Sequence, residues 1–527
     1  MNRKVDEPTG QVHERSCFEQ FFVGKEVCFM LTHPLSSAAA VPTAEHTSTR
    51  KDRRTRISAE EILRGDLGTE QALELDREHG NTDEMRALKF LNMAGPFTPV
   101  SPWELEDEQG VRRINASGYS AIPFGNAYPE LVEFLHQYLE HNREVDLPQQ
   151  SASRWRAALA HNLIALLAEF APSHADSQVH FANSGSEAVE NAIKFVRASR
   201  PRARYLINFQ HGYHGHTLMA LSLTPNHSYQ DLFKPMAADV VTLPFGEFDV
   251  LERAIAGLGP ENVAAVVLEP IQGEAGVIIP PEGYLHALGQ LCQRHAILVV
   301  ADEIQTALGR TGHWFESVAQ GLEPDIIALG KHLSGGMVPI GVTIARRTLC
   351  QRAVGGAGSD RLAGTYSGNS LSMAIAVKSL DLLIEHDLPA RAQILGQRGL
   401  QRLREIQAHH PRLVEEVRGA GMLFALQLRP VFAPDWLQSQ TDRIAELTSM
   451  LGWSALHQAG VQANVAMNTR RVVRLSPALT MPEELFEEMW NRVERAADLN
   501  DPAWHLVTHT HIQTLLGLAN LARVTTT

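Results

Sequence analysis

Four short apolar runs constrain the fold of this chain most strongly. They read RYLIN (204–208), AAVVLEP (264–270), AILVVADE (296–303) and DIIALGK (325–331), and each is separated from the next by at least one helix-sized stretch. Strands that are apolar on both faces and alternate with helices are typical of a mainly parallel sheet that is covered on both sides. The sequence therefore predicts the α/β class.

The first 85 residues differ in composition from the rest. They contain a Ser/Ala/Thr-rich stretch, LSSAAAVPTAEHTSTR, and then the charge cluster KDRRTR. A helical stretch is predicted to follow, with Ser58 as its N-cap. We expect an N-terminal extension over residues 1–85, partly disordered or helical, and we favour this over a dedicated functional module.

Charge and cysteine usage exclude several classes of protein. The 527 residues carry 47 Lys+Arg against 60 Asp+Glu, a net charge of −13, so a nucleic-acid or anionic-membrane partner is not expected. No window of about twenty residues is continuously apolar, so no membrane span is expected. The four cysteines, Cys17, Cys28, Cys292 and Cys350, form no CxxC pair. This pattern fits a reducing cytoplasm.

Polar residues that could react or bind a ligand lie where the predicted strands end. Lys331 ends one apolar run and Asp302 another, while Gly185 and Ser186 precede an amphipathic helix in HFANSGSEAVENAIKF. Taken singly, helix capping would explain the Gly-Ser pair, and an ordinary arginine partner would explain Asp302 about as well as a ligand does. Together, a phosphate cradle, a buried aspartate and a lysine with a depressed pKa are the parts that pyridoxal phosphate requires.

Six motifs then identify a family. NSGSEAVENAIK, HGYHGHT, VVLEPIQGEAGV, VVADEIQTALGRTG, IIALGKHLSGGMVPIG and GTYSGNSLSMAIA occur in this order. From about residue 90 to 500 the chain resembles the class III aminotransferases, the ornithine and ω-amino acid type, of PLP fold type I. The resemblance implies a hairpin and N-terminal segment of the small domain over 86–150, a large cofactor-binding domain over 151–389, a small α+β domain over 390–500 and a tail over 501–527.

The resemblance assigns roles around the cofactor ring. Lys331 resembles the lysine that forms the Schiff base and shuttles the proton, and Asp302 resembles the partner of the pyridine nitrogen. Gln305 is similar to the residue that binds the ring hydroxyl. Tyr213 matches the aromatic residue stacked on the ring, and Ile304 is expected on the opposite face.

Phosphate binding is assigned in the same way. Gly185 and Ser186 resemble the phosphate cradle, and Thr365 resembles a phosphate ligand from a second subunit. The resemblance therefore implies a homodimer with shared active sites. His214 and His332 flank cofactor motifs, and we interpret both as packing or supporting residues, with His214 counted in the cofactor site.

Substrate binding follows the family pattern only in part. Glu269 and Arg474 match a switch pair, in which the arginine receives a substrate carboxylate and the glutamate neutralises it otherwise. His216 stands where relatives that bind a second carboxylate carry an arginine, which favours an amine without a distal carboxylate. Tyr119 is a candidate for the pocket wall, although core packing would explain it equally well. No metal site is expected.

The resemblance implies ping-pong transamination from an ω-amine, a diamine or an amino acid to a keto acid such as 2-oxoglutarate or pyruvate. Three alternatives on the same scaffold are a decarboxylating transaminase, an aminomutase and a phospho-lyase. A further possibility is an active enzyme that its N-terminal extension recruits to a biosynthetic partner. An inactive interaction protein is disfavoured, because Lys331, Asp302 and Gln305 are intact.

Overall fold

The computed structural model describes residues 57–80, 93, 95–118, 120–148, 150–358, 361–362, 364–431, 441–469 and 471–510. The chain divides into two compact units, Met1–Asp66 and Leu67–Thr527. This division falls inside the predicted extension of residues 1–85, and the other predicted domain boundaries stay predictions. Tyr119, a predicted pocket residue, lies outside the described residues.

The described part of the first unit contains helix α1 (Ala59–Leu63). The Ser58 hydroxyl accepts a hydrogen bond from the Glu61 backbone N–H, and the Glu61 carboxylate accepts one from the Ser58 backbone N–H. This reciprocal arrangement satisfies two donors that the start of a helix leaves free. The predicted N-cap at Ser58 is confirmed.

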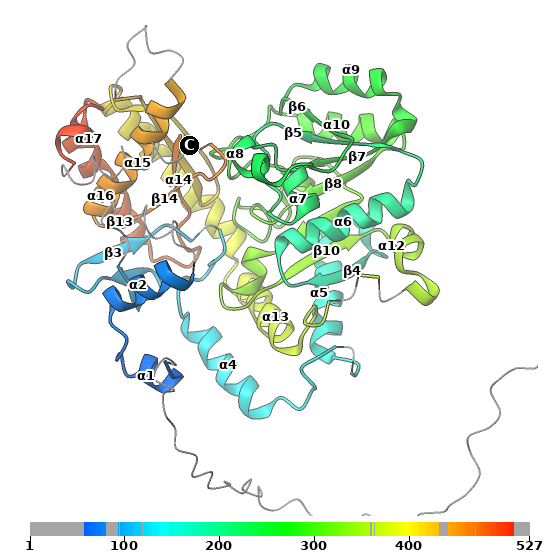
Figure 1. Ribbon diagram of the computed structural model, residues 1–527, viewed down its shortest axis with the longest axis horizontal. Coiled ribbons are helices and arrows are strands. Elements are labelled where there is room, and N and C mark those ends of the chain that lie inside the picture. The colour runs from blue at the N-terminus through cyan, green and yellow to red at the C-terminus, as the bar shows by residue number, and fades with distance from the viewer. Residues whose placement is uncertain are drawn as a thin grey trace, which may run out of the picture. The chain divides into compact units, whose positions relative to one another are not determined.

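The second unit is built around a seven-stranded sheet in the order β4-β10-β9-β8-β7-β5-β6 (Figure 1). Neighbouring strands are parallel except around β10, which runs antiparallel to both β4 and β9. The four apolar runs form β5, β7, β8 and β9, so the predicted mainly parallel sheet is confirmed. The strands are β4 (Gln178–Ala182), β5 (Tyr205–Phe209), β6 (Val240–Leu243), β7 (Val263–Leu268), β8 (Leu298–Asp302), β9 (Ile326–Leu329) and β10 (Gly341–Ala345).

Helices cover both faces of this sheet. In β7, Ala265 and Val267 share an apolar cluster with α6 and α12, whereas Val266 and Leu268 pack with α9 and α10. Because side chains alternate along a strand, both faces must be covered when every residue is apolar. The flanking helices are α5 (Arg154–Phe170), α6 (Gly185–Ser199), α9 (Phe248–Leu258), α10 (Tyr284–Arg294), α12 (Arg347–Val354) and α13 (Ser370–Glu385).

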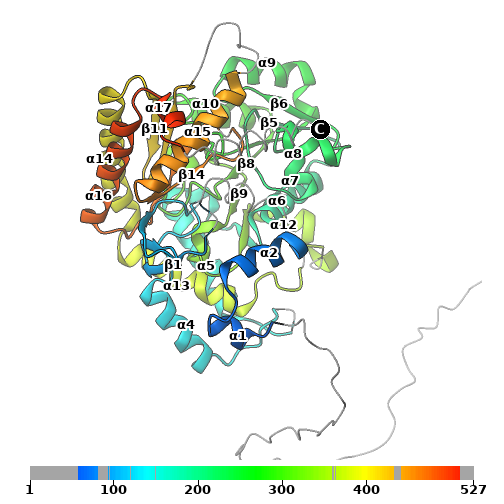
Figure 2. The ribbon, with the colours of Figure 1, turned by 60° about the vertical axis from the view of Figure 1, so that its left-hand side comes forward.

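A second, antiparallel sheet has the order β11-β12-β15-β14. Helices α14 and α16 run beside each other next to it (Figure 2). Trp490 packs edge-to-face on Phe424 and Phe486, with ring centroids 5.0 and 5.7 Å away. This is the smaller α+β arrangement that the sequence predicts. Its elements are α14 (Leu388–His409), β11 (Val414–Ala420), β12 (Leu423–Leu428), α15 (Thr441–Gln458), β14 (Asn464–Val465), β15 (Val472–Leu475) and α16 (Glu483–Asn500).

A third sheet, β1-β2-β3-β13, joins the N-terminal hairpin to the C-terminal elements. β13 pairs in parallel with β3, and the Ala116 N–H donates to the Gln462 carbonyl. An isolated parallel bridge between Ser117 and Ser476 places the segment before Tyr119 next to the end of β15, which carries Arg474. The strands are β1 (Thr98–Ser101), β2 (Glu104–Glu106), β3 (Arg112–Asn115) and β13 (Val461–Gln462).

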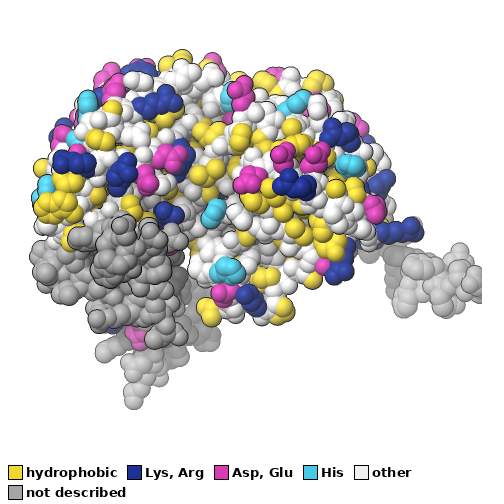
Figure 3. Space-filling view, turned by 90° about the horizontal axis from the view of Figure 1, so that it is seen from above, with side chains coloured by type: hydrophobic (Ala, Val, Ile, Leu, Met, Phe, Trp, Pro, Cys, Tyr) yellow, Lys and Arg dark blue, Asp and Glu magenta, His cyan; other side chains and the backbone are white. Residues whose placement is uncertain are grey.

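The remaining helices are short, apart from α2 (Thr69–His79) and α4 (Pro129–His141). They are η1 (Pro172–His174), α7 (Leu218–Ser222), α8 (His227–Gln230), η2 (Asp231–Phe233), η3 (Pro260–Asn262), α11 (Glu316–Ala319), η4 (Lys331–Ser334), η5 (Gly356–Gly358) and α17 (His505–Thr508). Among the described residues, no helix combines the length and apolarity needed to cross a bilayer. Acidic and basic side chains are interspersed on the face drawn in Figure 3.

Candidate active site

The carboxyl ends of three adjacent parallel strands bring the candidate residues together. Glu269 follows β7, Asp302 ends β8, and Lys331 comes two positions after β9. Parallel strands end at the same edge of a sheet, and this edge is where ligands bind in open α/β folds.

Lys331 has an unusual backbone and an unusual charge environment. Its φ is +35°, in the left-handed region that is costly for a residue with a side chain. The residue keeps some accessible surface, yet burial of its ammonium group lowers the pKa, and the nearby Glu274 and Asp302 offset this only in part. No ion pair to Lys331 is found within the described part of the chain. Burial thus shifts this lysine toward its neutral, nucleophilic form.

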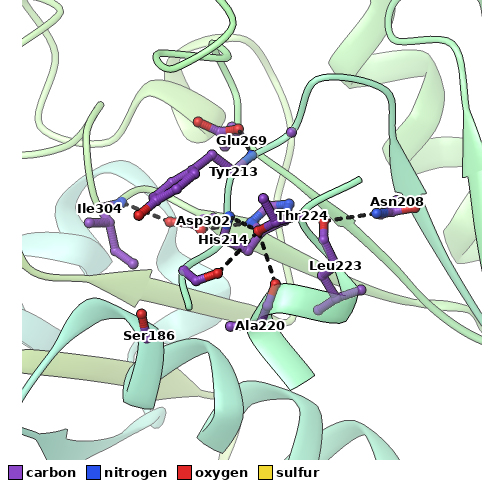
Figure 4. A network of polar contacts seen from close by, with 12 residues as sticks. Ser186, Asn208, Tyr213, His214, Ala220, Leu223, Thr224, Glu269, Asp302 and Ile304 are labelled. Carbon is purple, nitrogen blue, oxygen red and sulfur yellow. Dashed lines mark hydrogen bonds and ion pairs between the residues drawn. The ribbon is translucent and has the colours of Figure 1, made fainter. Parts of the chain in front are cut away.

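Asp302 is held by a buried histidine. Its Oδ2 lies 2.8 Å from His214 Nδ1, and its Oδ1 accepts the Ile304 backbone N–H at 3.2 Å (Figure 4). Burial opposes charge on His214, but the hydrogen bond to Asp302 and the negative charges of Asp302 and Glu269 together outweigh it and raise the His214 pKa. The Thr224 hydroxyl accepts the His214 backbone N–H at 2.9 Å. His214 therefore acts through Asp302, whose carboxylate it orients.

Tyr213 and Ile304 lie next to Asp302, as Figure 4 shows. The Tyr213 backbone N–H donates to Glu269 Oε1 at 2.8 Å, and this bond ties the tyrosine to the end of β7. Burial raises the pKa of the Tyr213 phenol, and the surrounding carboxylates raise it further. The ring is thus an uncharged aromatic surface at the strand edge.

Gly185 and Ser186 begin α6, whose N-terminus offers free N–H groups and the positive end of the helix dipole. The Ser186 hydroxyl accepts the His216 backbone N–H at 3.3 Å. A Cβ on Gly215, where φ is +122°, would lie 2.1 Å from Ser186 Oγ. A Cβ on Gly185 would lie 2.8 Å from the Ile304 side chain. Glycine at these two positions therefore allows Ser186 and Ile304 to approach the backbone this closely.

The structure corrects the expected pairing of Glu269 with Arg474. The ion pair of Arg474 is with Glu274, at 2.8 Å, and the side chains are 0% and 2% exposed. Gln305 joins the pair: its carbonyl oxygen accepts from Arg474 at 3.1 Å, and its amide donates to Glu274 at 2.6 Å. Glu269 instead accepts the backbone N–H groups of Tyr213 and Gly273.

The physical reason for this correction is the loop after β7. Glu269 stays at the strand end, where burial raises its pKa to about 7. The chain then turns at Gly273, which passes so close to Gln305 that a Cβ would lie 2.0 Å from its oxygen. This turn places Glu274, five positions after Glu269, next to Arg474. Burial opposes the Glu274 charge, but Arg474 and Lys331 lower its pKa, so the pair is ionic.

The two other predicted residues lie at accessible positions. The His216 ring is exposed and contacts Tyr213 and Tyr229 edge-on, with ring centroids 5.5 and 5.2 Å away. Thr365 is also exposed. Its loop is anchored near the start of α6, because Asn183 Nδ2 donates to the Ser367 hydroxyl at 3.3 Å.

Sequence reasoning missed an amide pair that fixes the Tyr213 loop. The Asn468 amide donates to the carbonyls of His211 and Gly212 at 2.7 and 2.9 Å. Its oxygen accepts from Asn226 at 2.6 Å, although the two residues lie 242 positions apart. Neither asparagine belongs to a recognisable motif, so no signal in the sequence marks this contact.

Comparisons with known proteins agree with this geometry. A family model described as aminotransferase class-III matches residues 102–497. Aminotransferase PigE from Serratia sp. (strain ATCC 39006) is 34% identical over 372 residues, which are 68% of this chain and 41% of PigE, so the match spans less than half of that relative.

Solved structures extend the comparison. An ornithine aminotransferase from Toxoplasma gondii is 25% identical with a TM-score of 0.70, covering 84% of this chain and 98% of that one. A PLP-bound amine transaminase from an uncultivated Pseudomonas species is 26% identical with a TM-score of 0.68, covering 77% and 94%.

Proposed function

The chain belongs to the class III aminotransferases, and from this premise we propose that it transfers an amino group from a primary amine to a keto acid with pyridoxal phosphate. The observation that carries the proposal is Lys331, whose pKa burial lowers, at the same sheet edge as the His214–Asp302 pair.

The residues of the site fit this cofactor. The start of α6 would hold the phosphate, and the absence of a Cβ at Gly185 and Gly215 lets Ile304 and Ser186 pack closely against this segment. Asp302 would keep the ring nitrogen protonated, with Tyr213 and Ile304 beside the ring, and the Lys331 amine would hold the aldehyde. When bound, the cofactor supplies an electron-accepting ring that stabilises negative charge on the substrate carbon.

The side chains of this protein supply binding and proton transfer. Once free of the aldehyde, the Lys331 amine can take and return the proton at the substrate carbon, and burial, which lowers its pKa, favours the neutral form that does so. Arg474 would bind the keto-acid carboxylate after leaving Glu274, which neutralises it at other times. An aminomutase needs no keto-acid partner, so this pair favours transamination.

We propose that the amine substrate lacks a distal carboxylate, as a diamine, a polyamine or a long-chain amine does. His216 stands where an arginine would bind that carboxylate, and its ring packs edge-on against Tyr213 and Tyr229. An imidazole cannot form the two-pronged contact that a guanidinium makes with a carboxylate.

A half-reaction screen tests both levels of the proposal. The protein reconstituted with pyridoxal phosphate is mixed with single amines, and the visible absorption band is followed without an acceptor. We expect putrescine to bleach the band faster than 4-aminobutyrate does, and the Lys331→Ala variant to show neither response. Equal rates for the two amines would refute the substrate class, and no response to any amine would refute transamination.

We also propose a homodimer in which Thr365 of one subunit completes the other site. Its exposure and its position beside the start of α6 support this. Mixing Lys331→Ala chains with Thr365→Val chains should restore one complete site per heterodimer and hence activity. If Thr365 served its own subunit, the mixture would stay inactive.

We propose a cytoplasmic location as well. Cys292 and Cys350 are buried free thiols, which fits a reducing compartment. Recovery of the tagged protein in a membrane or periplasmic fraction would contradict this location.

A further inference from the structure

Arg310 is a buried cation without an acidic partner among the described residues. Its side chain is fully buried, and its Nη1 donates to the backbone carbonyls of Met422 at 2.8 Å and Pro477 at 2.6 Å. Its Nε donates to His332 Nε2 at 3.1 Å, while its Nη2 has no hydrogen-bond partner in this part of the molecule. Burial accordingly lowers the Arg310 pKa to about 9.

Such an arrangement is costly to maintain. A guanidinium that leaves water without a carboxylate recovers only part of its hydration energy from carbonyl groups. An apolar side chain of similar size would fill the same space without that cost. Stability therefore does not explain why a buried arginine with three directional hydrogen bonds stands at this position.

The hydrogen bonds of Arg310 connect the segment next to Lys331 with the segment next to Arg474. His332 directly follows Lys331 in η4, and Pro477 lies three positions after Arg474. Met422 makes two hydrogen bonds with Arg310. Its carbonyl accepts from Arg310 Nη1, and its own N–H donates to the Arg310 carbonyl at 2.9 Å. One planar group thus connects the lysine turn with the strand that carries the carboxylate-binding arginine.

His332 provides a neutral acceptor at the lysine end. Burial holds its pKa well below the usual range, and the charge of Arg310 lowers it further. Its Nε2 accepts from Arg310, so its Nδ1 carries the proton and donates to the Ala307 carbonyl at 3.1 Å. A protonated ring could not accept this hydrogen bond.

We propose that Arg310 is a positioning residue that sets the separation between Lys331 and Arg474, and hence the length of dicarboxylate that the site accepts. This inference rests on the proposed function. It predicts a defect specific to the keto-acid side, because the amine substrate does not use Arg474.

The test compares Arg310→Lys with Arg391→Lys. Arg391 also donates to carbonyls just after β15, those of Leu479 and Met481, but no described contact links it to η4. Glutarate, a five-carbon dicarboxylate without a reacting carbonyl, is titrated into each reconstituted protein, and its dissociation constant is read from the cofactor absorption. We expect Arg310→Lys to weaken glutarate binding and raise the KM for 2-oxoglutarate about tenfold or more, since small misplacements cost this much.

In the same variant the KM for the amine should change less than about twofold, and Arg391→Lys should keep wild-type glutarate binding while losing only thermal stability. His332→Leu should reproduce the glutarate defect, and His332→Gln, whose amide oxygen can replace Nε2, should restore binding. If Arg310→Lys does not fold, the His332 pair gives the same test.

Equal losses for amine and dicarboxylate, or a change in stability alone, would overturn the positioning role. A wild-type protein that takes up no cofactor would instead refute the proposed function, so the two failures are distinguishable.

Discussion

Replacing Glu274 with glutamine tests the switch pair directly. Arg474 and Glu274 are both buried, and under the proposed function a dicarboxylate must displace Glu274 before it can bind the guanidinium. Glu274→Gln keeps the shape and one acceptor oxygen but removes the negative charge. We therefore expect tighter dicarboxylate binding and a less stable protein.

The magnitude follows from the geometry of the pair. At 2.8 Å and an effective dielectric constant of about 20, the attraction is about 6 kcal/mol before any desolvation is counted. Desolvation offsets most of this, and hydrogen bonds to charged groups contribute roughly 2 kcal/mol net. Losing a competitor of that strength should tighten glutarate binding about 30-fold. The unpaired buried guanidinium should lower the free energy of unfolding by about 3 kcal/mol.

Glutarate titration of the reconstituted protein measures the first effect, and urea unfolding measures the second. Glu269→Gln is the matched control, because Glu269 is equally buried and lies in the same loop but contacts no arginine within the described residues. Its glutarate affinity should change less than about threefold. Tighter binding in Glu269→Gln, or unchanged binding in Glu274→Gln, would refute the pairing of Arg474 with Glu274.

Three further predictions follow from individual contacts. Burial lowers the Lys331 pKa below 10.5, so the folded, cofactor-free protein binds fewer protons than the unfolded chain. Its free energy of unfolding, measured with urea, should therefore fall as the pH drops from 10.5, and the fall should be smaller in Lys331→Met. Gly215→Ala should weaken cofactor binding at least about tenfold in an equilibrium titration, since its Cβ would collide with Ser186. Gly257→Ala in α9, where the space around the Cβ is open, should leave cofactor binding unchanged. Asp302→Asn should lower the His214 pKa below that of the wild type, because it removes the charge that opposes burial; an unchanged imidazole titration in NMR spectra would contradict the coupling.

The central sheet and the clustering of its polar residues were predictable because they depend on local patterns. Apolar runs such as 325–331 identify buried parallel strands, and parallel strands place Asp302 and Lys331 at one edge without further information. β10 escaped prediction, because an antiparallel strand within a parallel sheet is a matter of chain topology that its apolar sequence does not encode.

Contacts that depend on loops were harder to predict. Residues 269 and 274 are both glutamates of the same motif, and only the turn at Gly273 decides which of them contacts Arg474. The carbonyl contacts of Arg310 are similarly invisible in sequence, because any residue can offer a backbone oxygen. Long-range side-chain partners therefore had to come from the structure.

The most direct test of the account concerns the bond between Lys331 and the cofactor. The reconstituted protein is reduced with sodium borohydride, which makes a lysine–cofactor C=N bond permanent, and its peptides are analysed by mass spectrometry. We expect the added mass to lie on the peptide containing Lys331 and to disappear in Lys331→Ala. Modification of a different lysine, or no stable modification of a protein that nevertheless transaminates, would contradict it.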